Sequence, residues 1–389
     1  MGSELDLTPL AGALLAVSTL LLGLALAPWL PRTMDAAERV VTGLCAAIVG
    51  VTLAGYLLAL VLGLHLPLVL LLSVAALGAG ALLVRPASAR LELARWTRLP
   101  GSGWWSSPEG RLLLATLAVA LGLGFLFARA VVVTPGGWLA HYSNVWSDWS
   151  FHASYTTTFA YGQNLPPQNP LFALTPFRYP FGPDFASALL LAGGWSVPAA
   201  LIWPGWAMAT LGLSGLILWA RRLTGALPAG LLAVTLTLLG GGLGFWFFFG
   251  DAARQGLLTT LAHLPRGYDR LPPPVNIQWY NPVLSYWLPQ RSFVFGAAIV
   301  VAVLLLLTPV LQATRLWQWR TAWQSLSGWP RGLLREEDSA FLWAGSLAAA
   351  LPWFHVHSLV VLGIVTLAWA LLLPRPGWLL FAVPLLLLA

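Results

Sequence analysis

Long apolar runs with almost no charge dominate this chain and decide what it can fold into. Of its 389 residues, 58% are hydrophobic and only 8% are charged, whereas a soluble domain carries about 25% charged residues. Several runs are about 18 residues or longer, enough to cross about 30 Å of hydrocarbon as a helix. We therefore expect an all-α polytopic membrane protein, because a membrane β-barrel would show short alternating segments instead.

The apolar runs predict about ten transmembrane helices. The expected spans are residues 9–30, 40–63, 66–84, 111–133, 185–220, 226–250, 292–311, 340–354, 358–373 and 377–389. The fifth run holds adjacent glycines and two prolines, which interrupt helices. We therefore expect it to form a short helix at the membrane surface, followed by a span that starts near Val197.

The arginines predict which loops face inward. With the N-terminus outside and ten alternating spans, fourteen of the arginines fall in inner loops, five fall in outer loops, and Arg129 lies near the outer end of the fourth span. An excess of arginine on the inner side follows the positive-inside rule. This distribution also explains the net charge of +7, so no nucleic-acid partner is expected.

Three parts of the chain follow from this pattern. Residues 1–84 are expected to form an N-terminal extension of three spans, and residues 85–110 a basic cytoplasmic linker. Residues 111–389 then form the main membrane module, with long outer loops at 134–184 and 251–291. Most histidines, and the acids that are not interleaved with arginine, lie on the outer side, so the candidate chemistry is expected there.

The first outer loop carries Asp148 and His152 four residues apart, within SDWSFHASYTTTFAYG. If this segment is a helix at the outer interface, with Ser147 as its N-cap and Gly162 at its end, both side chains share one face. The loop holds two acids in its fifty-one residues, so Asp148 is the candidate general base. The alternative is that Asp148 only places a favourable charge at a helix N-terminus.

Arginine and amide side chains beside aromatic rings are candidate ligands for a phosphate or a sugar. Arg178 is the only arginine of the first loop, and arginine suits bidentate phosphate binding. The alternative is an arginine that extends to the membrane interface. In the second loop the candidates are Asn276, Gln278, Gln290 and Arg291. The alternative there is an aromatic interface belt with capping asparagines.

Two histidines one residue apart, His355 and His357, occupy a third outward turn. With Asp148 and His152 they could hold a divalent metal ion, since histidines and a carboxylate are common ligands of such ions. The alternative is that they donate hydrogen bonds to a phosphate or a sugar. Because an HxH pair alone is a weak signal, no metal or other cofactor is assigned.

The segments DWSFH, GQNLPPQNPLFA and RYPFGPD resemble the GT-C superfamily of polytopic membrane glycosyltransferases, within an uncharacterised bacterial GT-C-like branch. The similarity covers roughly residues 111–373. It implies an inverting reaction with a polyprenyl-phosphate sugar donor, and an outer-loop carboxylate that acts as general base or helps to bind an ion. Asp148 matches that carboxylate, although many members have an Asp-Glu pair where this chain has Asp148-Trp149.

The sequence therefore predicts a membrane glycosyltransferase that transfers a sugar to an unidentified glycan, lipid or protein acceptor on the outer face. In this prediction Asp148 deprotonates the acceptor, and Arg291 or Arg178 stabilises the leaving phosphate. The resemblance implies the bacterial inner membrane, with the active loops facing the periplasm or the exterior. One alternative is a transporter or flippase for a lipid-linked or amphipathic substrate, which predicts charges deep inside the spans. Another is a non-catalytic membrane assembly protein, which predicts no shared outward cavity.

Overall fold

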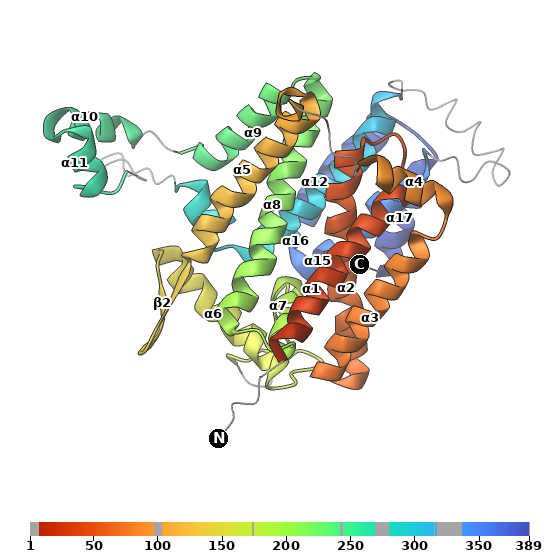
Figure 1. Ribbon diagram of the computed structural model, residues 1–389, viewed down its shortest axis with the longest axis horizontal. Helices are drawn as coiled ribbons and strands as arrows, with labels where there is room; N and C mark the ends of the chain where they lie inside the picture. Colours follow the sequence, from red (N-terminus) through yellow and green to blue (C-terminus); the bar gives the residue numbers. More distant parts are fainter. Residues whose placement is uncertain are drawn as a thin grey trace.

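The computed structural model describes residues 8–96, 103–172, 175–241, 244–268, 280–314, 316 and 337–388, and these residues are largely helical (Figure 1). The longer helices are α1 (Thr8–Leu26), α2 (Ala36–Leu62), α3 (Leu66–Leu83), α4 (Ala87–Trp96), α5 (Pro108–Ala128), α6 (Ser143–Ala160), α7 (Gly182–Ala192), α8 (Val197–Thr224), α9 (Leu227–Leu239), α10 (Phe245–Gln255), α12 (Arg291–Gln312), α14 (Ser339–Ala348), α16 (Val356–Leu372) and α17 (Gly377–Leu388). The shorter elements are η1 (Ala27–Trp29), η2 (Trp104–Ser106), β1 (Val131–Thr134), β2 (Gly137–Ala140), α11 (Leu257–Ala262), η3 (Val283–Trp287) and α15 (Leu351–Phe354).

Six helices in the described part of the chain are long and apolar enough to cross a membrane, namely α1, α2, α3, α5, α8 and α12. Shorter apolar helices, of 10 to 17 residues, cover α7, α9, residues 339–354, α16 and α17. The prediction of an all-α membrane protein is confirmed at this level. The ten-span count stays a prediction.

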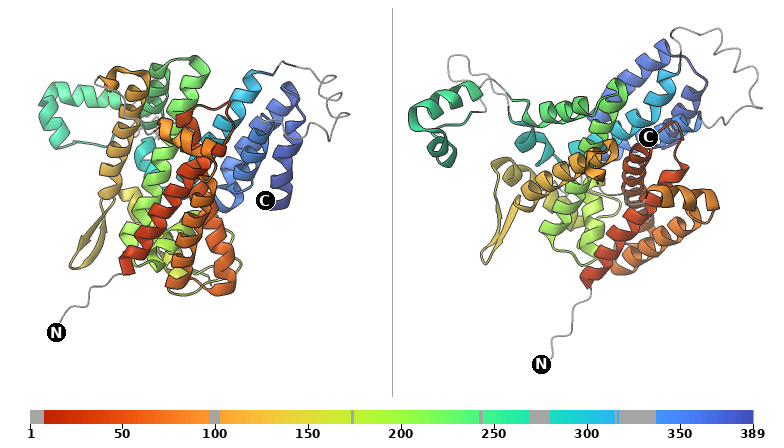
Figure 2. Two further views of the ribbon diagram at one scale, coloured as in Figure 1. Left: turned by 45° about the vertical axis from the view of Figure 1, so that its right-hand side comes forward. Right: turned by 45° about the horizontal axis from the view of Figure 1, so that its top comes forward.

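Helix α12 forms the centre of the bundle and is the most buried of the six long helices. It packs against α8, α14 and α2, while α1 packs against α2 and α3 (Figure 1). The C-terminal helices α14, α16 and α17 lie together on one side, and α10 and α11 project from the other side in all views (Figure 2). Buried Leu, Ile, Val, Ala and Phe side chains form one continuous core.

The predicted break in the fifth apolar run is present, because α7 ends at Ala192 and α8 starts at Val197. Glycine is needed at this break. The amide of Gly12 in α1 donates to the carbonyl of Gly193 at 2.9 Å, and a Cβ on Gly193 would lie 2.7 Å from the backbone of Gly12. Nearly every residue of α7 is buried among α6, α8, α1 and α2. The position of this helix at the membrane surface stays a prediction.

The predicted span at 226–250 is also wrong as one continuous helix. Helix α9 ends at Leu239, and a separate amphipathic helix, α10, begins at Phe245. Three consecutive glycines at 240–242 separate them in the sequence, and each glycine in a helix interior costs about 1 kcal/mol relative to alanine. Asp251 of α10 is paired with Arg266, with 2.8 Å between Oδ2 and Nε.

The first expected outer loop contains more regular structure than the sequence indicates. The hairpin of β1 and β2 pairs Val131 with Ala140 and Thr134 with Gly137. Helix α6 follows it and packs against α7 and α8. The buried aromatic residues of α6, among them Trp149 and Phe159, face the bundle. They are therefore packing residues of the core.

Candidate functional site

Helix α6 places Asp148 and His152 one turn apart on the same face, as the sequence predicts from their spacing. The helix starts at Ser143, so Ser147 is not its N-cap; the Ser147 hydroxyl instead donates to the carbonyl of Asn144 at 3.0 Å. The Asn144 amide donates to the carbonyl of Leu284 at 2.9 Å. This contact fixes the start of α6 against η3, which leads into α12.

Asp148 meets the residue that precedes α12. The Gln290 side-chain amide donates to Oδ2 of Asp148 at 2.6 Å, across 142 positions of sequence. Asp148 is half-buried, and no ion pair joins it to any residue that the structure describes. The other two described acids of the predicted outer loops differ: Asp184 and Asp251 are buried and each is paired with an arginine. Asp148 is thus the partly accessible carboxylate among the three.

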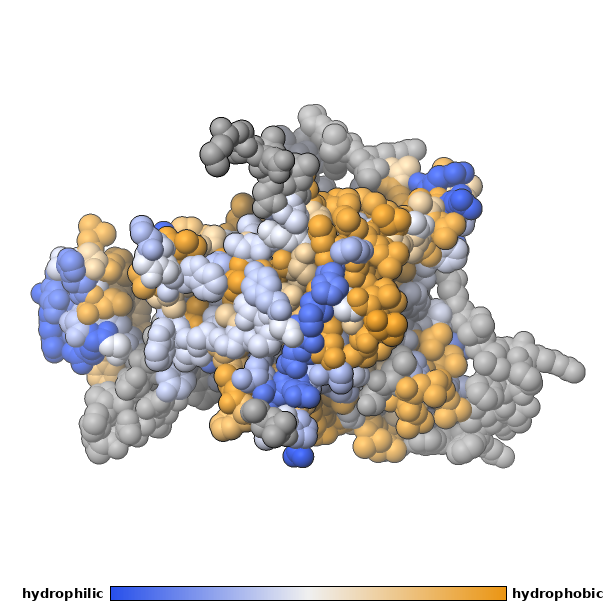
Figure 3. Space-filling view, turned by 90° about the horizontal axis from the view of Figure 1, so that it is seen from below, coloured by the Kyte–Doolittle hydropathy of each residue, from blue (hydrophilic) through white to orange (hydrophobic). Residues whose placement is uncertain are grey.

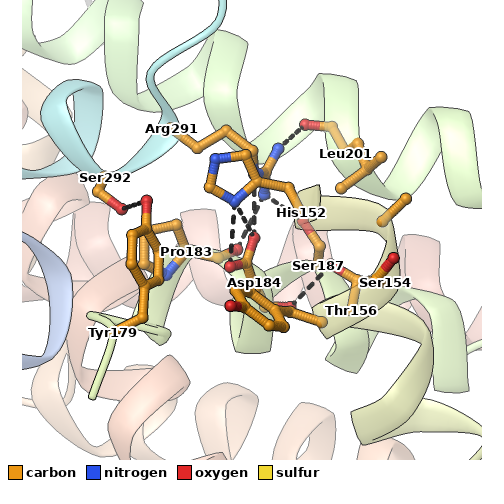
Figure 4. A network of polar contacts seen from close by, with 12 residues as sticks. His152, Ser154, Thr156, Tyr179, Pro183, Asp184, Ser187, Leu201, Arg291 and Ser292 are labelled. Atoms are coloured by element: carbon orange, nitrogen blue, oxygen red, sulfur yellow. Dashed lines mark hydrogen bonds and ion pairs between the residues drawn. The ribbon is translucent and has the colours of Figure 1, made fainter. Parts of the chain in front are cut away.

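A buried polar cluster is formed by His152, Asp184 and Arg291 (Figure 4), and His152 lies one helical turn after Asp148. Their exposed fractions are 3%, 0% and 1%. The His152 Nδ1 atom lies 2.9 Å from Oδ1 of Asp184, and the Arg291 Nε atom lies 3.4 Å from the same oxygen. Because Asp184 also lies in the first turn of α7, its negative charge is favoured by the helix dipole.

The other guanidinium nitrogens of Arg291 also donate hydrogen bonds to groups within the protein. It donates to the carbonyl of Pro183 at 2.9 Å, to the hydroxyl of Ser187 and to the carbonyl of Leu201 in α8 (Figure 4). Pro204 in the next turn of α8 removes the backbone donor to the carbonyl of Ala200, beside Leu201. Arg291 therefore holds α7, α8 and α12 together. The predicted role of Arg291 in stabilising a leaving phosphate is not compatible with this burial.

Tyr179 connects the buried cluster to the Asp148 side of the site. Its hydroxyl lies 3.1 Å from Oγ of Ser292, and its ring lies 6.0 Å from that of His152. Burial raises the pKa of Tyr179, and the nearby carboxylates of Asp184 and Asp148 raise it further. The phenol therefore stays protonated at neutral pH and can donate a hydrogen bond.

Sequence reasoning missed Tyr179, Asp184 and Ser292 as parts of the site. Asp184 was detectable as one of only two acids in the first outer loop. Tyr179 and Ser292 carried no comparable signal, because each is one hydroxyl residue among many. Their roles depend on contacts between segments more than a hundred residues apart.

Of the two histidines of the third turn, His355 contacts α12. Nδ1 of His355 lies 2.8 Å from Oγ of Ser358, and its ring packs edge-on against Phe293, with centroids 6.1 Å apart. Burial lowers the pKa of His355, and the neighbouring His357 lowers it further. His357 is exposed, and its ring centroid lies 5.4 Å from that of His355.

The four suggested metal ligands do not form a ligand set. Within the described residues, no group of three or more His, Cys, Asp or Glu side chains is arranged to hold a metal ion. His152 is directed to Asp184, while His355 is directed to Ser358. The suggestion of a metal held by Asp148, His152, His355 and His357 is therefore not supported by the geometry.

The remaining predicted ligands lie elsewhere. Arg178 is exposed and lines a separate hollow of about 450 Å³ with Asn169, Phe177 and Tyr179. Through Tyr179 this hollow adjoins the polar cluster. Asn276 and Gln278 lie outside the described residues.

Seen from the lower side of Figure 1, hydrophilic residues form a band across the middle of the molecule, beside a large hydrophobic area (Figure 3).

Comparison with known proteins gave no relatives: no family model, no curated protein and no solved structure matches this chain.

Proposed function

We propose that the protein is an inverting membrane glycosyltransferase of the GT-C type, with Asp148 as its general base. The observation that carries this proposal is the state of Asp148. It is the carboxylate of the described outer segments that is partly accessible and has no cationic partner there. A general base must be ionised and within hydrogen-bond reach of the proton that it removes. Asp184 and Asp251 are buried in ion pairs and do not meet this requirement.

In the proposed reaction the acceptor hydroxyl attacks the anomeric carbon of a polyprenyl-phosphate sugar. Asp148 takes the hydroxyl proton, a bond forms between the acceptor oxygen and the anomeric carbon, and the bond from that carbon to the phosphate oxygen breaks. The lipid phosphate leaves with the electron pair. Gln290 holds Oδ2 of Asp148. Oδ1, whose neighbour is the hydroxyl of Ser147 at 3.4 Å, is the oxygen that takes the proton of the acceptor.

The role of the phosphate-binding cation passes from Arg291 to Arg178 in this proposal. Arg178 is exposed, has no ion pair in the described part of the chain and lies next to Tyr179. Its guanidinium can therefore bind a phosphate without breaking a buried contact. The buried cluster of His152, Asp184 and Arg291 then positions α6 and α12, so that Asp148 and Gln290 stay in contact.

The ten-span topology, the outward N-terminus and the location in a bacterial inner membrane belong to the same proposal. The arginine distribution supports the topology and the outward N-terminus, and the resemblance implies the location. The polyprenyl-phosphate donor, the membrane lipid and an outer-face acceptor are the partners that this function requires.

The test compares cells that express the wild-type chain with cells that express Asp148→Asn. Asparagine keeps the shape and can still accept from Gln290, but it cannot take a proton. A positioned base contributes about 10²–10⁴-fold to rate, so we expect transfer from the lipid-linked sugar to fall by at least about a hundredfold. Glu337→Gln is the control, because Glu337 is an exposed acid at a different place. Wild-type glycan and lipid-linked sugar levels in the Asp148→Asn strain, at equal expression, would remove the proposal.

A transporter or flippase is the second candidate, and the buried cluster favours it. Ionisable residues inside a helical membrane bundle commonly mark substrate or proton pathways, and Asp184, His152 and Arg291 are all buried. This candidate predicts that a lipid-linked sugar crosses the bilayer of proteoliposomes unchanged. The glycosyltransferase predicts instead that the sugar leaves its lipid phosphate.

A further inference from the structure

A second polar cavity lies at the opposite end of the bundle from Asp148. It has a volume of about 590 Å³ and lies between the first turns of α2, α5 and α9 and the last turn of α8. These helix ends gather at the upper side of Figure 1. Its charged lining residues are Asp35, Glu38, Glu109, Arg111, Arg221 and Arg222.

Two ion pairs fix part of this cavity. Arg221 bonds Asp35 at 2.5 Å, and Arg222 makes two bonds of 2.5 Å to the carboxylate of Glu38. Glu38 is buried and Asp35 caps the start of α2, so these pairs are part of the bundle structure. These pairs neutralise the charges of Asp35 and Glu38 within the protein.

Arg111 and Glu109 are the remaining charged residues of the wall. Both are exposed in the first turn of α5, and neither makes an ion pair with a described residue. The charges of the six side chains therefore sum to zero, and Arg111 and Glu109 are left open to a ligand. A ligand that carries both a negative and a positive group matches this arrangement, whereas a simple anion leaves the Glu109 carboxylate facing like charge.

An apolar surface continues from the cavity toward the middle of the bundle. Exposed leucines line α5, among them Leu114 and Leu117, and exposed leucines line α9, among them Leu232 and Leu236. Helices α5 and α9 contact each other, and on both helices these exposed leucines follow the cavity-lining residues along the chain. A ligand with a polar head and apolar chains can use both parts.

We propose that this cavity binds the headgroup of a zwitterionic phospholipid that carries a primary ammonium group, such as an ethanolamine phospholipid. Its phosphate faces Arg111, and its ammonium faces Glu109. Its acyl chains follow the leucines of α5 and α9. This site is independent of the proposed glycosyltransferase activity, because it lies at the other end of the bundle.

The test uses the purified full-length protein and mixed vesicles of an ethanolamine phospholipid and a glycerol phospholipid of equal chain length. After extraction into detergent, the lipids that stay bound are counted by native mass spectrometry. We expect retention of the ethanolamine lipid over the glycerol lipid. Loss of one charge-assisted contact in a partly exposed cavity should lower this retention by about threefold to tenfold in Arg111→Gln and in Glu109→Gln.

The matched control is Arg90→Gln, the same change at an exposed arginine of α4, which should retain the lipid like the wild-type protein. A thermal unfolding curve for each variant shows that the bundle is intact. Equal retention of the two lipids, or unchanged retention in folded Arg111→Gln, would overturn the headgroup assignment. Displacement of the lipid by soluble phosphoethanolamine as readily as by a short-chain ethanolamine lipid would show that the leucine surface contributes nothing, and would overturn the lipid assignment.

Discussion

The substitution Asp184→Asn tests whether the buried cluster holds the site together. It removes the negative charge that faces Arg291 and keeps the side-chain volume and a partner for His152. With 3.4 Å between Nε of Arg291 and Oδ1 of Asp184, the Coulomb attraction at an effective dielectric constant of about 20 is about 5 kcal/mol. Breaking a buried pair by removing one partner typically costs about 3–5 kcal/mol.

The expected loss lies near the lower end of that range. Arg291 keeps its hydrogen bonds to Pro183, Ser187 and Leu201, so its charge remains partly satisfied. We therefore expect the free energy of unfolding to fall by about 3 kcal/mol, which changes the unfolding equilibrium constant by about a hundredfold. Reversible unfolding in mixed micelles, with denaturing detergent as the variable, measures this quantity.

Asp251→Asn is the matched control for this experiment. Asp251 is as buried as Asp184, but its partner Arg266 is 47% exposed. Screening by solvent reduces such a pair to about 1 kcal/mol or less. The reasoning is refuted if Asp184→Asn costs no more than Asp251→Asn. A double variant, Asp184→Asn with Arg291→Gln, should cost less than the sum of its single changes, because the two charges are coupled.

Three further predictions concern the site and its surroundings. In Gln290→Leu the Asp148 carboxylate loses its fixed orientation, so we expect lower transferase activity with an unchanged unfolding midpoint. Gln290→Glu should reduce activity further, because it places a like charge 2.6 Å from Asp148. Equal activity in the wild-type protein and both variants would contradict this role of Gln290. The lowered pKa of His355 means that its folded form favours the neutral ring. Its stability contribution is therefore complete above the unfolded pKa of about 6.5 and is lost as the pH falls from there through the folded pKa; unfolding curves at stepped pH should show this slope in the wild-type protein and a smaller slope in His355→Gln. Cys45, the single cysteine, is buried, so Tyr161→Cys should label from outside intact cells and Leu223→Cys only after permeabilisation, and the reverse pattern would contradict the proposed orientation.

The helical membrane architecture is predictable from the sequence because long uncharged runs leave no alternative. The break before α8 is also predictable, since the Gly193-Gly194 pair and Pro198 disrupt one continuous helix. The burial of α7 inside the bundle is not predictable from the sequence, because it depends on packing against four other helices. The span expected at 226–250 is interrupted after Leu239, because the glycine run that follows disfavours a helix although the segment is strongly apolar.

The candidate site was predictable only in part. The spacing of Asp148 and His152 correctly places them on one face of a helix, and the scarcity of acids directs attention to Asp148. The sequence could not show that Gln290 binds Asp148, or that Arg291 is taken up by Asp184. These contacts join residues 142 and 107 positions apart, and no local pattern encodes them.

The proposed reaction at Asp148 can be tested most directly with purified protein in proteoliposomes. The measurement follows the release of free polyprenyl phosphate from a polyprenyl-phosphate hexose, by mass spectrometry, in the presence of membrane extract as the source of acceptor. The account predicts release by the wild-type protein and by Glu337→Gln, and release that is lower by about a hundredfold or more in a folded Asp148→Asn protein. Equal release by wild-type and Asp148→Asn proteins would contradict the assignment of Asp148 as the general base.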